Sequence, residues 1–424
     1  MNFFCKIKAG SLQFVLFIGA VIAVLLVTFV LLSHSHSFFS KKTGKYIAVI
    51  QKGDFALQMA LKEKTNSSET KIAIADDGIV TETKKTLWGV FEKYQVKSKF
   101  KKSVFQKQVL VGTGITAKTP ALFLKDNQRP LIIVGAARIT GDAFLPQQGI
   151  RPGNIAGESY FSSSLIYGRQ KASTAELPIL DNKIQQQITL LSSGFIPTNV
   201  KSDEIQLFKN TELKNSFAAP TQYIRGTHID LSGAKLTGNI IVQASNEIRL
   251  DASSQLRDIL LVAPKILIDA NTQGTFQAFA SSKITVGKNC KLDYPSALVV
   301  QKKLNSTTSA NSLASLPDIS IESGTIIKGL ILYKSEEEER LFYPQLKLQE
   351  QATVVGQVYC EKNLELKGKV IGSVYTDSFM ALENGNVYQN HLYKGTIDCL
   401  SLHKEFVGLS FEFEGNKKIA KWLY

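Results

Sequence analysis

A short apolar pattern recurs along the second half of the chain. Two apolar residues flank one residue of any kind, and the first members of successive copies lie 19, 18, 18, 35, 27, 18 and 16 residues apart. The copies are Ile229/Leu231, Ile248/Leu250, Ile266/Ile268, Ile284/Val286, Ile319/Ile321, Leu346/Leu348, Leu364/Leu366 and Met380/Leu382. We interpret the gap of 35 as nearly two periods with a degenerate turn at 297–300, and the gap of 27 as one period plus the charged excursion 336–340. The underlying repeat is therefore close to 18 residues.

A period of this size predicts a stack in which each repeat forms one turn of a coil. Each turn lays short strands parallel to those of the neighbouring turns, about 4.8 Å away. A second series, often with glycine or aspartate near its middle, has the same register: 236–240, 256–260, 326–331, 354–358 and 370–374. Glycine suits a bend between two faces because it adopts positive φ at little steric cost. The predicted fold class is all-β, with a parallel, right-handed β-solenoid of about 18 residues per turn.

The middle residues of the apolar pattern predict a row of charges that faces outward. Asp230 is followed one turn later by Arg249, and Lys347 is followed by Glu365. Opposite charges on neighbouring strands contribute roughly 0.2 to 1 kcal/mol each.

The run 352–374, Ala-Thr-Val-Val-Gly-Gln-Val-Tyr-Cys-Glu-Lys-Asn-Leu-Glu-Leu-Lys-Gly-Lys-Val-Ile-Gly-Ser-Val, resembles the bactofilins. These polymer-forming bacterial scaffold proteins have β-helical turns with the same order of valine, glycine and leucine. The resemblance covers roughly the last third of the chain and implies a β-helix with a scaffolding role. The chain differs from bactofilins in its long N-terminal half and in insertions at 302–318 and 335–345.

The N-terminus predicts a membrane anchor. A basic head (1–10) precedes an uncharged apolar run (11–32), which is long enough to span a bilayer as one helix. No alanine-any-alanine cleavage site directly follows it. The head contains Lys6 and Lys8 and favours a cytoplasmic N-terminus, with the rest of the chain outside the cytoplasm. The sequence 6–10 that leads into the apolar run is similar to the N-termini of pilin-like proteins, which usually carry glutamate where Val15 stands.

The rest of the chain divides by its patterns. A linker (33–45) follows the anchor, and a small antiparallel β-rich domain (46–129) contains a short helix at 55–62. We expect the first solenoid turns at 130–168 and an insertion at 169–225, in which Asp181 caps a helix that buries Ile184, Ile188 and Leu191. The main solenoid then occupies 226–398. A C-terminal cap (399–424), formed by a strand and a short helix, covers its last edge.

Charge is concentrated at the beginning of the chain. The formal net charge is +14, and residues 1–150 contain 21 Lys and Arg against 9 Asp and Glu, which is +12 of that total. Lysines alternate with aromatic residues along 91–107, at Lys93, Lys97, Lys99, Lys101, Lys102 and Lys107. The patterns leave open a solvated strand face, an anionic surface such as lipid headgroups, and, least favoured, nucleic acid.

Few residues suggest chemistry. Asp251 and Asp269 occupy equal positions on successive turns, with Glu322 and Glu383 at the same offset farther along, as a polysaccharide-cleaving β-helix would require. Turn-capping is the alternative interpretation. The histidines His228, His391 and His403 are far apart, and His34 and His36 lack further metal ligands nearby. The cysteines Cys5, Cys290, Cys360 and Cys399 show neither disulfide nor metal spacing. We therefore predict no catalytic residue, cofactor or metal site.

These patterns lead to two hypotheses. The first is a single-pass inner-membrane protein of the bacterial envelope, with its bulk in the periplasm and a rigid solenoid that makes protein contacts in a scaffold or pilus-like assembly. The second is a carbohydrate-binding or polysaccharide-cleaving surface protein. The expected partners are the lipid bilayer through residues 11–32 and other proteins or further copies of this chain. A glycan remains open as a partner, and nucleic acid is not expected.

Overall fold

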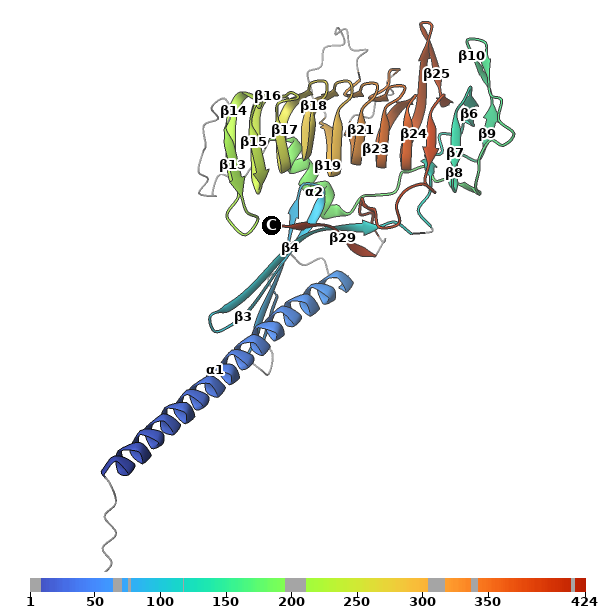
Figure 1. Cartoon of the computed structure of the whole chain (residues 1–424). Helices are drawn as coiled ribbons and strands as arrows, with labels where there is room; N and C mark the ends of the chain where they lie inside the picture. The colour runs from blue at the N-terminus through green and yellow to red at the C-terminus, as the bar shows by residue number, and fades with distance from the viewer. Residues whose placement is uncertain are drawn as a thin grey trace, which may run out of the picture. The chain divides into compact units, whose positions relative to one another are not determined.

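The computed structural model describes residues 9–63, 71–74, 78–116, 118–194, 211–303, 317–336, 342–412 and 416–424. Strands dominate these ranges, together with one long apolar helix and a parallel sheet of many strands (Figure 1). The chain divides into two compact units. The helix unit comprises Met1–Ala60, Thr70–Lys84 and Val96–Gln106, and the strand unit comprises Leu61–Glu69, Lys85–Gln95 and Lys107–Tyr424. The insertion predicted around 302–318 lies mostly outside the described residues.

Helix α1 (Ala9–Lys62) runs without interruption for 54 residues. The predicted linker at 33–45 and the separate helix at 55–62 are therefore both wrong as separate elements. Up to Ile47 the described side chains of the helix are exposed, and beyond it Val49, Gly53, Leu57 and Ala60 form a buried stripe with helical spacing. Packing along this stripe stabilises the last turns of α1. The polar segment 33–45 therefore stays helical, because it lies between the apolar run 11–32 and these packed turns.

An antiparallel sheet contains most of the strands predicted in 46–129. Its order is β1 (Lys71–Ile74), β2 (Val80–Trp88), β3 (Phe91–Phe100) and β4 (Ser103–Gly114), and both β28 (Val407–Gly408) and β29 (Lys417–Leu423) pair with β4. β1 is antiparallel to β2, and β28 and β29 are antiparallel to β4. The short helix predicted near the C-terminus is thus a strand. These C-terminal residues extend the sheet at β4 and do not cap the parallel strands as predicted.

The remaining elements form the parallel array, small flanking sheets and one further helix. The array contains β5 (Leu122–Leu124), β7 (Arg138–Thr140), β8 (Ala143–Leu145), β12 (Gln170–Ala172), β13 (Glu212–Asn215), β14 (Gln222–Asp230), β15 (Lys235–Gly238), β16 (Ile240–Leu250), β17 (Gln255–Ile268), β18 (Gln273–Val286), β19 (Lys291–Lys302), β20 (Ile319–Ile321), β21 (Ile326–Ser335), β22 (Leu346–Leu348), β23 (Thr353–Leu366), β24 (Lys369–Glu383) and β27 (Thr396–Asp398). β25 (Asn386–Gln389) pairs with β24 antiparallel. β6 (Leu131–Val134), β9 (Ile150–Pro152) and β26 (His391–Tyr393) form one small sheet, and β10 (Asn154–Ile155) and β11 (Glu158–Ser159) form another.

The register of the array confirms the repeat in most places. Direct parallel partners link Ile229, Ile248, Ile266, Ile284, Ile319, Leu346, Leu364 and Phe379. Two predictions are corrected. Because Ile284 pairs directly with Ile319, the gap of 35 residues is one period with a long insertion. The last member of the series is Phe379 rather than Met380, because the register shifts between Cys360 and Asn363.

The order of the strands in the array differs from the order in the chain. We expected 130–168 to begin the stack ahead of 226, but β5 pairs with β24 through Leu122 and Val374, β8 pairs with β5, and β12 pairs with β8. β27 likewise pairs with both β24 and β7. The segment 122–172 therefore extends the array beyond its latest strands. The chain then passes through α2 (Asn182–Ser192) to β13 and β14, which pair with β15 and β16 at the other end.

Two apolar clusters explain why several strands are apolar on both faces. Inward residues from 121–145 and 224–397 form the main core, including Ile248, Ile266 and Ile284, all 0% exposed. A second cluster lies outside the same strands. In β17, for example, Leu261 joins the main core while Leu260 and Val262 join the outer cluster, together with residues of α2 and 402–411. One flank of the array is thus covered by protein.

Two buried glutamines attach this outer layer. The Gln277 side chain accepts a hydrogen bond from the Val90 amide (2.9 Å) and donates one to the Trp88 carbonyl (3.1 Å). The Gln357 side chain accepts one from the Leu409 amide (2.7 Å). Backbone groups buried on the array are satisfied in this way, and both segments are fixed on its flank.

At the predicted bends the backbone has the positive φ that glycine adopts easily. Gly329, Gly356 and Gly372 are register partners and have φ of +146°, +149° and +147°. A Cβ at Gly356 would lie 1.9 Å from the Gly329 carbonyl oxygen, so a side chain is excluded by contact as well as by φ. Asp258 occupies a related bend with φ +61°.

Helix α2 confirms its prediction in detail. Asp181 is the N-cap and its side chain accepts a hydrogen bond from the Lys183 amide at 3.0 Å. Ile184, Ile188 and Leu191 are buried in the outer cluster. The helix contacts β17, β18 and β19 and thus covers one flank of the array.

Candidate functional site

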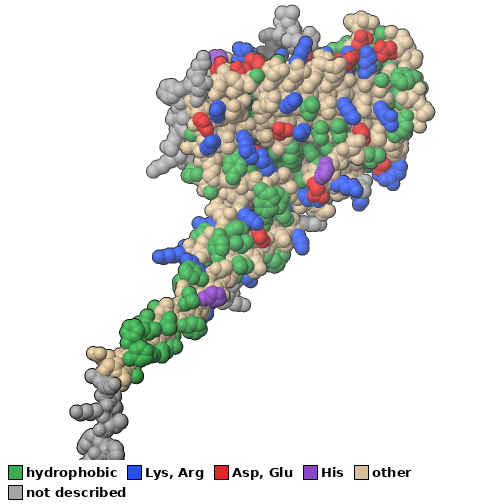
Figure 2. Space-filling view, viewed as in Figure 1, with side chains coloured by type: hydrophobic (Ala, Val, Ile, Leu, Met, Phe, Trp, Pro, Cys, Tyr) green, Lys and Arg blue, Asp and Glu red, His purple; other side chains and the backbone are tan. Residues whose placement is uncertain are grey.

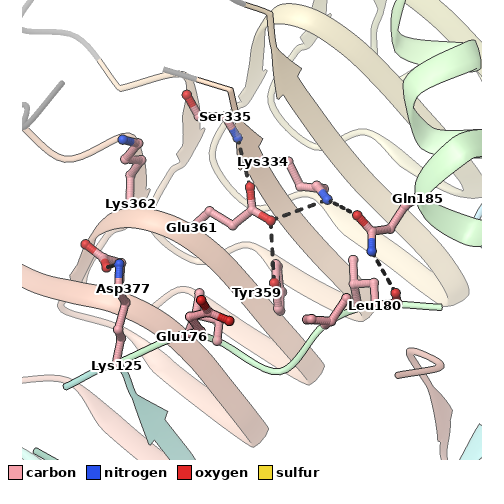
Figure 3. Close-up of a pocket in the computed structure, with 12 residues that line it drawn as sticks. Lys125, Glu176, Leu180, Gln185, Lys334, Ser335, Tyr359, Glu361, Lys362 and Asp377 are labelled. Atoms are coloured by element: carbon pink, nitrogen blue, oxygen red, sulfur yellow. Dashed lines mark hydrogen bonds and ion pairs between the residues drawn. The ribbon is translucent and has the colours of Figure 1, made fainter. Parts of the chain in front are cut away.

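A cavity of about 340 Å³ lies where α2 and the preceding strap (176–180) meet three neighbouring strands of the array (Figure 3). β21 contributes Lys334 and Ser335 to its lining, β23 contributes Tyr359, Glu361 and Lys362, and β24 contributes Asp377. The remaining lining residues are Lys125, Glu176, Leu177, Ile179, Leu180 and Gln185. Three acidic and three basic side chains therefore share one small space.

Glu361 lies at the centre of the polar contacts. Its carboxylate accepts hydrogen bonds from the Ser335 amide (3.1 Å) and the Tyr359 hydroxyl (3.5 Å), and it lies 3.4 Å from Lys334 Nζ. Lys334 also donates to Gln185 Oε1 of α2 at 2.9 Å (Figure 3). Two strands and the helix are thereby joined through one charged network.

A second ion pair lies beside this network. Lys125 Nζ lies 2.7 Å from Asp377 Oδ1, and the Asn127 amide donates to the Asp377 carbonyl. The Tyr359 hydroxyl also donates to the Pro178 carbonyl at 3.2 Å. Burial first, and then the neighbouring Glu361 charge, raise the pKa of Tyr359 well above its ordinary value. This phenol therefore remains protonated and acts as a donor at neutral pH.

We expect Lys334→Met to loosen α2 from the array. The substitution removes the bond to Gln185 and leaves the partly buried Glu361 carboxylate without its cation, which costs about 1 to 3 kcal/mol. Hydrogen exchange of the amides in 182–192 should accelerate while that of β18 is unchanged. Lys328→Met serves as the control, because that lysine forms a more exposed ion pair with Asp293. Equal acceleration in both variants would contradict the structural role of Lys334.

The sequence contains a signal for this cluster in the positions of its strand residues. Lys334 and Glu361 each follow one residue after the register pair Tyr333 and Cys360, and Asp377 follows Thr376, the partner of Cys360. Polar residues at one offset on three neighbouring parallel strands lie side by side. Residues of 176–185 could not be assigned to this place, because their contact with the strands depends on tertiary packing.

Asp251 and Asp269 occupy equal positions after neighbouring strands, as predicted, but each carboxylate contacts residues close to it. The Asp251 carboxylate accepts hydrogen bonds from the Ser253 amide (2.9 Å) and from Ser253 Oγ, which lower the pKa of the Asp251 carboxyl. Asp269 forms an ion pair with Arg249 at 2.7 Å. This agrees with the turn-capping interpretation for Asp251. Glu322 is near Ser320, while Glu383 pairs with Lys367 at 3.1 Å.

The predicted charge pair forms in one case and not in the other, and Glu365 does not face outward as predicted. Lys347 and Glu365 form an ion pair at 3.0 Å, and Glu365 is nearly fully buried there. Asp230 and Arg249 are register partners, but the guanidinium pairs with Asp269 instead, while the Asp230 carboxylate accepts from Ser232. Asp269, which directly follows β17, thus competes successfully for the Arg249 guanidinium.

The remaining candidates are dispersed. His34 and His36 are exposed on α1, His228 contacts Asn246, and His391 and His403 contact backbone groups of their own segments. Within the described residues, no three His, Cys, Asp or Glu side chains are grouped as metal ligands. Among the aromatic residues that alternate with lysines, Phe91 and Tyr94 are buried, so the lysines occupy the more solvated side.

The three described cysteines are unpaired thiols. Cys290 is buried and its thiol donates to the Asp269 carbonyl at 3.1 Å, which places it in a turn. Cys360 is fully buried, and burial raises the pKa of its thiol to about 12. Cys399 is half-buried. Cys5 lies outside the described residues.

We expect Cys360 to resist a thiol reagent at pH 8 until the protein unfolds. With a pKa of about 12, only about one thiol in ten thousand is ionised, and the thiolate is the reactive form. Labelling should be followed by mass spectrometry in a Cys5→Ser variant, with half-buried Cys399 as the internal reference. Modification of Cys360 at the rate of Cys399 in the native protein would contradict this packing.

Comparison of the chain with protein-family models, with curated proteins and with solved structures finds no match.

Proposed function

We propose that this chain is a membrane-anchored structural or assembly protein of the bacterial cell envelope. In this proposal α1 crosses the inner membrane, the bulk of the chain lies in the periplasm, and the parallel array is a right-handed β-solenoid of about 18 residues per turn. The solenoid presents a stiff surface for contacts with other proteins.

The observation that carries the proposal is the persistence of the register. Equivalent aliphatic positions pair directly from Ile229 to Phe379, across long insertions and changes of turn length. Every step adds a parallel ladder of backbone hydrogen bonds and extends one continuous apolar core. A stack built in this way is stiff along its length, which suits a surface that organises partners.

The apolar part of α1 supports the anchor. Its described residues from Gly10 to Leu32 are exposed, and the helix is long and apolar enough to cross a membrane (Figure 2). The apolar run of 22 residues, 11–32, measures about 33 Å at 1.5 Å per residue, which matches a hydrocarbon core of about 30 Å. Burial in lipid would remove this large apolar surface from water.

Two resemblances support an assembly role. The bactofilin-like run 352–374 occupies β23 and the start of β24, where Gly356 and Gly372 form stacked bends. The pilin-like start continues into one unbroken helix whose far end packs in the helix unit. Because 122–172 covers the array beyond β24, we favour lateral contacts with partners over end-to-end growth at that end.

The test is site-specific photo-crosslinking in living cells. The photoreactive residue replaces Lys235, Lys291 or Lys369, which are exposed on the array, and in a control it replaces buried Ile266. We expect discrete high-mass adducts from the exposed positions and none from Ile266. A topology reporter fused after Tyr424 should be active only outside the cytoplasm. Absence of adducts at all exposed positions would contradict the contact role, and a cytoplasmic reporter would contradict the location.

The cavity favours a second candidate, a carbohydrate-binding protein. It is lined by Glu176, Glu361 and Asp377 together with Tyr359, so acidic side chains and an aromatic residue share one space. Titration of the purified chain with oligosaccharides derived from the cell wall tests this candidate. Binding that Glu361→Gln abolishes, and that Lys328→Met leaves unchanged, would favour it over the assembly role.

A further inference from the structure

We infer that the membrane-proximal end of the helix unit binds the headgroups of anionic lipids through a cluster of lysines. This inference rests on the proposed membrane anchorage of α1 and adds a second, charge-specific contact with the bilayer. It assigns a role to the tip of the β3–β4 hairpin, which the proposed scaffold function does not use.

The helix unit is strongly basic. Its described residues contain ten lysines and two acidic residues, Asp54 and Glu82, so their formal net charge is 10 − 2 = +8. The lysines are Lys41, Lys42, Lys45, Lys52, Lys71, Lys84, Lys97, Lys99, Lys101 and Lys102, and all but Lys97 are exposed. Such a charge density attracts a polyanionic surface.

The structure places the hairpin tip beside the helix at its membrane-proximal side. Lys45 Nζ lies 5.1 Å from the centre of the Phe100 ring, and Lys101 Nζ lies 5.6 Å from the same ring. Farther along the helix, Gly53 faces Phe105, since a Cβ there would lie 2.8 Å from the Phe105 ring. The strand β4 thus runs along α1 so that its start, next to Lys101 and Lys102, lies nearer the apolar end of the helix.

The spacing along α1 brings this cluster within electrostatic reach of the headgroups. Phe38 and Phe39 are 57% and 60% exposed and lie about 9 to 11 Å beyond Leu32 along the axis. Aromatic side chains in this position are typical of the membrane interface. Lys41 and Lys42 lie about 14 to 15 Å, and Lys45 about 20 Å, beyond Leu32 along the axis. The hairpin tip at the level of Lys45 is therefore within reach of the anionic headgroups, given the length of lysine side chains and a Debye length of about 8 Å.

The charge pattern favours lipid over nucleic acid or a protein surface. The cluster directly follows a segment of membrane length on one continuous helix, and a juxtamembrane lysine cluster recognises anionic headgroups. On the hairpin, the face of the Phe100 ring carries the ammonium groups of Lys45 and Lys101, so this ring is occupied by the protein's own lysines rather than open to a base. A tethered cluster also meets its lipid partner at high effective concentration, so modest intrinsic attraction suffices.

The test uses the full chain reconstituted into vesicles of phosphatidylcholine alone or of phosphatidylcholine rich in phosphatidylglycerol. A spin label at Ser103→Cys, in a Cys5→Ser/Cys399→Ser background, reports accessibility to a neutral, water-soluble nickel relaxation agent. We expect a several-fold loss of accessibility in the anionic vesicles only, reversed by high salt. The variant K99Q/K101Q/K102Q should abolish this loss.

The matched control is K235Q/K291Q/K369Q, which removes the same charge from exposed positions on the array and should retain the loss. No difference between the lipids, or an unchanged difference in K99Q/K101Q/K102Q, would overturn the inference. Equal shielding in both lipids would indicate a protein contact at the tip and would also overturn it. If alkaline extraction releases the chain from the vesicles, the anchorage itself is wrong, and this outcome is recorded separately from the label.

Discussion

Gly356→Ala is expected to destabilise the strand unit by about 3 kcal/mol or more. Gly356 has φ +149°, and a Cβ there would lie 1.9 Å from the Gly329 carbonyl oxygen and 2.9 Å from the Phe406 ring. The oxygen belongs to the backbone of the neighbouring strand and cannot move without breaking the ladder. The measurement is the thermal midpoint of unfolding of the detergent-solubilised chain, with resistance to proteolysis as the readout of the folded fraction.

Gly385→Ala is the matched control for this prediction. Gly385 also has positive φ (+76°), but no atom lies within 4 Å of a Cβ built there. Gly385→Ala should therefore lower the free energy of unfolding only by the cost of holding alanine at positive φ, about 1 to 2 kcal/mol. Similar losses in the two variants would show that the stacked bends do not approach each other as closely as described.

Phe379→Ala is expected to cost about 3 to 5 kcal/mol. Phe379 is 0% exposed, belongs to the main core and is the register partner of Leu364. Removing the ring leaves a cavity that close-packed neighbours can fill only in part. Unfolding in urea, followed by circular dichroism of the solubilised chain, measures the loss.

Leu382→Ala discriminates between the two registers. The apolar repeat placed Leu382 in the core, whereas the structure makes it half-buried and pairs it with Val387 of β25. Its truncation should cost less than half as much as that of Phe379. A larger loss at Leu382 than at Phe379 would restore the predicted register.

The inward positions were predictable because they depend on local alternation. Ile248, Ile266 and Ile284 are spaced by the length of one turn, and each is apolar because its neighbours above and below are apolar. Helix α2 was predictable for the same reason, since Asp181 caps it and Ile184, Ile188 and Leu191 share one face. The polar cavity was not predicted, although its strand residues share an offset on three turns.

The errors have a common physical origin. The segment between Ile284 and Ile319 includes an insertion, although the two residues are direct register partners. A loop between two strands can lengthen without adding a strand to the array, so the number of residues does not give the number of strands. Residues 33–45 lack an apolar face, yet they are helical because α1 is held beyond them at Val49 and Leu57. Apolar and polar residues alternate only weakly along 417–423, and this segment is a strand because it pairs with β4.

The sequence by itself determined the apolar helix, the parallel strands with a period near 18, and the charge concentrated around residues 41–107. These features follow from side-chain periodicity and composition, which act between near neighbours. Only the tertiary structure decided that 122–172 stacks beyond β24, that one flank of the array is covered, and that Glu361 meets Lys334 and α2. The physical reason is that a strand edge offers the same backbone donors and acceptors to any partner, so which strand pairs with it is decided by the packing of the whole chain.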